Sequence, residues 1–124
     1  MKIGIMGGTF DPIHYGHLIL AETAYDRFGM DKVLIMPAGD PYFKVERGVS
    51  ADEDREAMTR LAIEGNPHFE FSDLELKREG DTYTVDTLKI LKEQYPSAVT
   101  ICSDLRAPQN KICHCFHCFP IYLP

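Results

Sequence analysis

Two glycines and two histidines lie close together near the start of this chain, at Gly7, Gly8, His14 and His17. Glycines ahead of a helix let backbone N–H groups approach a phosphate, and the helix N-terminus adds the positive end of a dipole. Because His14 and His17 are three residues apart, both side chains can point into one site from the first helical turn. The residue types and their spacing indicate a phosphate-binding site at a strand-to-helix turn.

The elements around this turn predict an α/β fold. Residues 2–6 form an apolar run typical of a buried parallel strand, and residues 14–28 carry apolar side chains at helical spacing. Gly29 is placed to end that helix, and residues 32–36 predict a second buried strand. A β-α-β order implies a right-handed crossover and a parallel sheet, with the ligand crevice at the carboxyl ends of its strands.

The loop over residues 37–44 follows the second strand, so we expect it to face the glycine-rich loop. It ends in Lys44, whose flexible cation suits a triphosphate partner. The residues alone leave open a solvated surface lysine. Phe43 suits stacking on a base or ring, and core packing is the alternative.

A second helix is predicted to follow. Ser50 to Glu53 have the form of a capping box, and the helix should run to about residue 64 with Met58, Leu61 and Ala62 facing inward. Asp54 and Arg55 are expected on its solvated face. Residues 69–74 alternate apolar and polar side chains, as a half-exposed strand does.

Residues 80–87, Gly-Asp-Thr-Tyr-Thr-Val-Asp-Thr, enter a further helix that should end near residues 95–96. Unpaired N–H donors at a helix N-terminus favour an anion. The alternative is an ordinary Thr84 N-cap with Tyr83 packed beside it, and both interpretations are compatible.

The run from Gly7 to His17 resembles the H-x-G-H signature of the nucleotidyltransferase superfamily. Its full wording, Gly-Gly-Thr-Phe-Asp-Pro-Ile-His-Tyr-Gly-His, is similar to that of bacterial nicotinate-nucleotide adenylyltransferases. Residues 82–87 resemble the Thr-Tyr-Thr-x-Asp-Thr segment of the same family. Where that family often shows Pro-Pro-His-Lys, this chain keeps Lys44 but has Tyr42 and Phe43 before it.

This resemblance implies a Rossmann-like nucleotidyltransferase fold that transfers AMP from ATP to nicotinate mononucleotide and releases pyrophosphate, a late step in NAD biosynthesis. His14 and His17 would be the catalytic residues, donating hydrogen bonds to the phosphates. His17, deeper in the motif, should matter most for catalysis. The implied ATP- and phosphate-binding residues are Gly7, Gly8, Thr9, Phe10, His14, His17 and Lys44. The implied nicotinate-nucleotide-binding residues are Thr82, Tyr83 and Thr84. Mg²⁺ would arrive with ATP, held by substrate and water, with no metal-binding residues in the protein.

Composition narrows the function classes. The formal charge of −6 argues against a general nucleic-acid binder, which would usually be basic. The longest apolar runs fall short of a membrane span, and no signal peptide is apparent, so we expect a cytoplasmic protein without a membrane partner. The sequence does not indicate an oligomeric state.

The character of the chain changes near residue 96. All four cysteines, Cys102, Cys113, Cys115 and Cys118, come after it, and the chain contains no Trp. The resemblance covers residues 1–96, which we expect to form an incomplete adenylyltransferase domain. Family features that should follow, a ring-stacking Trp and an Ile-Ser-x-Thr-x-x-Arg signature, are missing. Residues 97–104 could still form a strand.

We therefore expect residues 97–124 to be an aberrant tail, such as a segment read in the wrong frame, rather than a domain. The truncated chain is expected to be inactive or nearly so. A zinc or redox appendage is the alternative, although Cys-x-Cys-x-x-Cys without a second pair is not a standard zinc spacing. Two further functional alternatives stay open: a non-catalytic nucleotide- or metal-binding remnant, and a related enzyme such as a phosphopantetheine adenylyltransferase.

Overall fold

The computed structural model describes residues 1–39, 48–78 and 84–104. Strands and helices follow one another along the chain as β1 (Lys2–Gly8), α1 (Tyr15–Phe28), β2 (Lys32–Pro37), α2 (Asp52–Ile63), β3 (Phe69–Phe71), α3 (Thr84–Gln94) and β4 (Val99–Asp104). This order confirms the α/β class predicted from the sequence.

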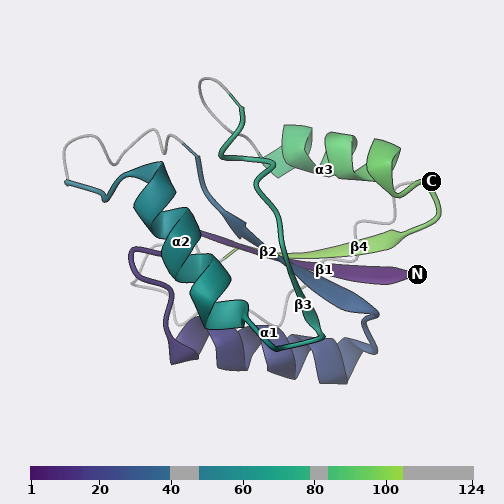
Figure 1. Ribbon diagram of the computed structural model, residues 1–124. Coiled ribbons are helices and arrows are strands. Elements are labelled where there is room, and N and C mark those ends of the chain that lie inside the picture. The colour runs from purple at the N-terminus through teal and green to yellow at the C-terminus, as the bar shows by residue number, and fades with distance from the viewer. Residues whose placement is uncertain (40–47, 79–83, 105–124) are drawn as a thin grey trace, which may run out of the picture.

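The four strands form one parallel sheet in the order β3-β2-β1-β4 (Figure 1). The chain moves outward from β1 to β2 and β3, then returns across the sheet to place β4 on the other side of β1. The strand order therefore reverses at β1. In open parallel sheets, ligands bind at the carboxyl ends of the strands beside such a reversal, and the loop with the glycines and histidines lies there.

The same reversal places the helices in two layers. Right-handed crossovers from β1 to β2 and from β2 to β3 lie on one face, and the return crossover lies on the other. Figure 1 shows α1 below the sheet and α3 above it. One apolar cluster joins β1 and β2 to α1 and α2 through Met6, Ile35, Ala21 and Ile63. A second packs Ile3, Ile5 and Leu34 against Leu88 and Leu91 of α3.

The first β-α-β unit agrees closely with the sequence prediction. β1 continues to Gly8 instead of ending at Met6, and α1 begins at Tyr15 with His14 as its N-cap. Gly29 adopts the left-handed conformation at the C-cap, as expected from its position. β3 is shorter than predicted, at three residues.

The prediction for α2 was wrong in two respects. Leu61 is 71% exposed and Ala62 is also exposed, whereas the inward row is Arg55, Thr59 and Ile63. The N-cap is Ala51, and no side chain caps the helix, so the expected capping box at residues 50–53 does not form. Met58 is half-buried and Asp54 is exposed.

β4 lies beyond the change in composition at residue 96. Its backbone pairs with β1 from Val99 to Asp104, so the sheet continues past that boundary. In the described ranges, no helix is long and apolar enough to cross a membrane.

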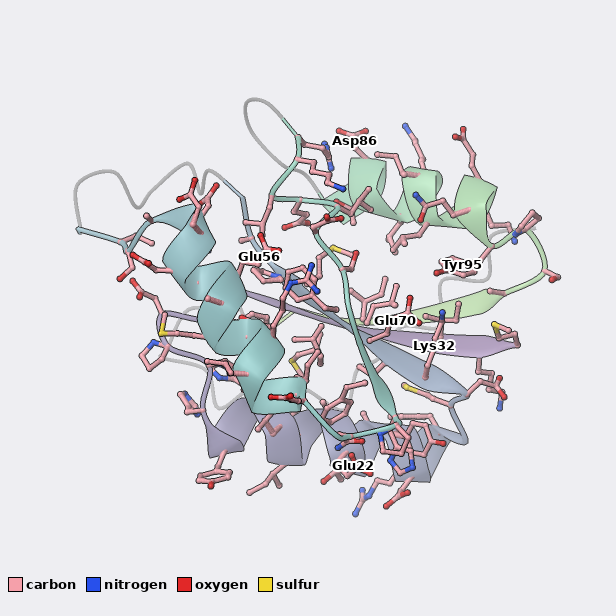
Figure 2. All side chains as sticks on the ribbon, viewed as in Figure 1. Glu22, Lys32, Glu56, Glu70, Asp86 and Tyr95 are labelled. Carbon is pink, nitrogen blue, oxygen red and sulfur yellow. The ribbon has the colours of Figure 1, made fainter. Side chains whose placement is uncertain are left out.

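An ion pair secures the sheet at the amino ends of its strands. Lys32 of β2 donates to the Glu70 carboxylate of β3 at 2.8 Å and to the Tyr95 hydroxyl at 3.4 Å. Figure 2 shows Lys32 and Glu70 directed toward one another, with Tyr95 nearby. The hydrogen bond to Glu70 is the main cause that raises the pKa of Lys32. This contact ties β2, β3 and the segment after α3 together, far from the histidine-bearing loop.

Candidate functional site

The candidate site lies where β1 and β2 end, at the carboxyl edge of the sheet (Figure 1). Gly8 pairs with Pro37 in the last step of the β1–β2 ladder, and the Ala38 N–H donates to the Gly8 carbonyl at 2.7 Å. The loops that follow the two strands therefore begin side by side, as the β-α-β order predicted.

His14 and His17 cap the first turn of α1 reciprocally. The Gly16 N–H donates to Nδ1 of His14 at 3.1 Å, and the His14 N–H donates to Nδ1 of His17 at 3.1 Å. The two ring centroids lie 3.8 Å apart with a tilt of 32°. This is the geometry of a capping box in which histidines occupy both the N-cap and the N3 position.

The cap determines which ring nitrogen carries the proton. A neutral imidazole has one donor and one acceptor nitrogen, so a ring whose Nδ1 accepts an N–H must carry its hydrogen on Nε2. Neither Nε2 has a hydrogen-bond partner among the residues that the structure describes. The arrangement thus presents two Nε2–H donors from one helical turn.

Burial and charge both favour the neutral form of His17. Its pKa is lowered from 6.5, first by burial and second by the proximity of His14. His17 is half-buried while His14 is exposed.

Phe10 forms the wall behind His17. Its ring is 2% exposed and meets the His17 imidazole edge-on, with centroids 5.1 Å apart. Its φ of 52° is unusual for a residue with a side chain. A Cβ on Gly8 would come within 2.9 Å of the Phe10 ring, so the glycine allows the ring to fold back over the end of β1. The preceding residue, Gly7, is not required by a close contact of this kind, since a Cβ there would meet nothing within 4 Å.

Arg55 was missed by the sequence analysis, which expected it on a solvated face. Its side chain is 1% exposed and donates to the Thr9 carbonyl at 2.9 Å and to the Ala38 carbonyl at 2.7 Å. Arg55, Thr59 and Ile63 are four residues apart and lie on one helix face, but that spacing alone does not distinguish a buried arginine from an exposed one. The apolar pattern of α2 drew the prediction to the wrong face.

A second polar group lies at the start of α3. The Thr87 hydroxyl donates to the buried Glu75 carboxylate at 3.0 Å and accepts from Arg78 at 2.9 Å. Thr87 is the last residue of the Thr-Tyr-Thr-x-Asp-Thr segment, and Glu75 and Arg78, which precede that segment, were not singled out by the sequence analysis.

Several predicted site residues lie outside the described ranges: Lys44 with its neighbours Tyr42 and Phe43, Thr82, Tyr83, and the cysteines beyond Cys102. Thr84 is the first residue of α3, and only its backbone is described. Among the described residues, no cluster of three or more His, Cys, Asp or Glu side chains could hold a metal ion.

The chain is similar to known proteins in sequence and in fold. The family model described as cytidylyltransferase-like matches residues 5–113, which extends past the boundary expected at residue 96. A probable nicotinate-nucleotide adenylyltransferase of Desulfitobacterium hafniense is 55% identical over 95 residues, covering 77% of this chain and 46% of the relative. One from Dehalococcoides mccartyi is 52% identical over 96 residues, covering 77% and 47%. The chain thus spans about half the length of the curated relatives it matches.

Among solved structures, the chain is similar to a Plasmodium falciparum nicotinic acid mononucleotide adenylyltransferase complexed with NaAD. The TM-score is 0.69 at 23% identity, over 82% of this chain and 50% of that one. This likeness confirms the Rossmann-like nucleotidyltransferase fold that the Gly7–His17 signature implied.

Proposed function

The chain belongs to the cytidylyltransferase-like family, and from that premise we propose that the protein is a nicotinate-nucleotide adenylyltransferase. Its relatives at 52–55% identity carry that name. In this proposal the described residues supply the phosphate-binding part of the site. The substrates are ATP and nicotinate mononucleotide.

The reaction is a phosphoryl transfer. A phosphate oxygen of nicotinate mononucleotide attacks the α-phosphorus of ATP and forms a P–O bond. The bond from the α-phosphorus to the bridging oxygen breaks, and pyrophosphate leaves with that electron pair. The attacking oxygen is already anionic, so no general base is needed. Catalysis then depends on alignment and on donors that meet the developing charge.

The reciprocal histidine cap is the observation that supports this proposal most directly. It occupies Nδ1 of both rings and leaves an Nε2–H on each that is not used within the described structure. Two such donors at a helix N-terminus suit phosphoryl oxygens, because the helix dipole and the N–H groups both favour negative charge. A histidine acting as general base would need a free acceptor nitrogen, and the cap occupies it.

The remaining roles complete the proposal. Backbone amides of Gly8, Thr9 and Phe10 would contact phosphates, and Lys44 would reach the triphosphate. Thr82, Tyr83 and Thr84 would receive the nicotinate carboxylate through the start of α3. ATP would arrive as its Mg²⁺ complex, with the ion held by triphosphate oxygens and water.

A binding and turnover assay on the chain tests the proposal. Mg-ATP affinity is measured by calorimetry, and pyrophosphate release is then followed with nicotinate mononucleotide, nicotinamide mononucleotide or phosphopantetheine as acceptor. We expect Mg-ATP to bind, and any release to be fastest with nicotinate mononucleotide. Absence of Mg-ATP binding, or faster release with phosphopantetheine, would contradict the assignment.

A further inference from the structure

Arg55 is a buried cation that the reaction does not use. Its guanidinium donates through Nε to the Ser50 carbonyl at 3.1 Å and pairs with Asp52 through the second amino group. The first amino group donates to the carbonyls of Thr9 and Ala38. Taking a guanidinium out of water is unfavourable unless its donors are satisfied, and here each nitrogen has a partner.

Those partners come from three separate segments. Thr9 lies in the loop after β1, Ala38 in the loop after β2, and Ser50 just before α2. A planar fork with several donors can hold such a set in fixed relative positions, which a single ammonium cannot do. One side chain therefore joins the two loops at the carboxyl edge of the sheet to the start of α2.

The contact with Thr9 also determines the direction of an N–H group. The Thr9–Phe10 peptide is trans, because the only cis bond in the described chain joins Asp11 and Pro12. In a planar trans peptide the carbonyl and the N–H point in opposite directions. Since Arg55 holds the Thr9 carbonyl toward the interior, the Phe10 N–H points away from the guanidinium. Within the described residues, no acceptor is bonded to that N–H.

We propose that Arg55 is a positioning residue for the phosphate site: by holding the Thr9 carbonyl it turns the Phe10 N–H outward as a donor for a nucleotide phosphate, and by holding the Ala38 carbonyl it keeps the loop after β2 beside it. This role rests on the proposed function. It acts through the backbone, and Arg55 itself does not contact the substrate.

Three variants of the full chain test the role. Arg55→Met removes every donor and keeps the length of the side chain. Arg55→Lys keeps the charge but not the fork. Arg60→Met is the matched control, because Arg60 lies on the same helix, is exposed, and pairs with Glu56 instead of either loop.

The first readout needs no ligand. Amide resonances and hydrogen exchange are measured by NMR below the onset of unfolding. We expect Arg55→Met to shift the Phe10 amide and to speed exchange at Ala38, whose N–H bonds to Gly8, by roughly tenfold or more. Exchange at Leu34, in the middle of β2, should stay within roughly twofold of the wild type. A merely structural arginine would lower the melting temperature and leave both loop signals as they are in Arg60→Met.

The second readout is Mg-ATP affinity. Arg55→Met should weaken it by roughly 10- to 100-fold, Arg55→Lys by less, and Arg60→Met by no more than about twofold. Should Arg55→Met fail to fold, Arg55→Lys provides both readouts. Unchanged affinity alongside altered loop signals would overturn the proposed role. If the wild type does not bind Mg-ATP, the proposed function fails, whereas the ligand-free readout still decides whether Arg55 sets the loop.

Discussion

The backbone N–H of His14 donates to the ring of His17, while the ring of His14 accepts from the N–H of Gly16, the second residue of the same helix. Each ring therefore uses its Nδ1 to stabilise the start of α1, and its Nε2–H has no hydrogen-bond partner among the described residues. The groups proposed to meet the phosphates are the same groups that cap the helix, so the function and the local fold share one pair of side chains.

The substitution His17→Asn separates these two roles. The Asn amide oxygen can take the place of Nδ1 and keep the cap, but nothing replaces the Nε2–H donor. In a version of the enzyme that is competent for turnover, we expect adenylyl transfer to fall by about 10²–10³, the usual loss for one preorganised donor, with little change in stability. Pyrophosphate release and urea unfolding measure the two effects.

His68→Asn is the control, because His68 lies away from the site and contacts Glu22 and Tyr25. Near-normal turnover in His17→Asn would refute the assignment of His17, and His17→Ala should lose both turnover and the cap.

Stability should depend on pH through His17. Its folded-state pKa lies below 6.5, so below that value the unfolded chain binds a proton more readily than the folded chain. The contribution of His17 to the free energy of unfolding is fully present above pH 6.5. It is lost as the pH falls through the lowered pKa of the folded state. Urea midpoints between pH 8 and pH 5 should decline more in the wild type than in His17→Asn. Equal declines in both proteins would show that His17 does not cause the effect.

Gly16→Ala should not give the stabilisation usual for a helix. Replacing Gly by Ala in a helix commonly gains roughly 0.5–1 kcal/mol, but a Cβ here would lie 2.9 Å from Cε1 and 3.0 Å from Nδ1 of His14. We expect the His14 ring to move and its cap, worth about 0.5–2 kcal/mol, to be lost. In a His14→Ala background the same change should become stabilising. A stabilising Gly16→Ala in the wild type would show that the ring tolerates the Cβ.

Two aromatic residues of the same motif should differ sharply in their effect on stability. Phe10 is 2% exposed and Tyr15 is 82% exposed. Phe10→Ala should lower the free energy of unfolding by about 3–5 kcal/mol, because it leaves a cavity in the core. Tyr15→Ala should change it by less than about 0.5 kcal/mol, as is usual for surface sites. Chemical denaturation of the two variants side by side checks this, and similar losses would mean that Phe10 is not a core residue.

The parts of the fold that were predicted correctly depend on local periodicity. The apolar runs of β1 and β2, the helical spacing of α1 and the Gly29 cap each follow from neighbouring residues along the chain. The same reasoning failed for α2, where Leu61 was expected inside and Arg55 outside. A buried arginine is favourable only when carbonyls from distant segments surround it, and α2 alone gives no sign of those carbonyls.

The prediction of a capping box at Ser50 was wrong for a related reason. The N–H of Ser50 donates to the carboxylate of Asp11, distant in the chain, at 2.9 Å, and its carbonyl accepts from Arg55 five residues later, so the backbone of Ser50 is held by contacts other than a capping box. Local motifs predict what a segment prefers in isolation, and a stronger tertiary partner can override that preference.

The sequence by itself determined the family, the parallel α/β fold and the position of the histidine pair, because these depend on residue types at short, regular spacing. Only the tertiary structure decided that Nδ1 of each histidine is occupied, that Phe10 folds back over Gly8, and that Arg55 joins the loops after β1 and β2. Each of these is a contact whose energy depends on distance and direction between atoms. The histidine cap and the Phe10–Gly8 contact span only a few residues, and their directions depend on atomic positions that residue types do not specify. The Arg55 contacts form only after the crossovers have brought distant segments together.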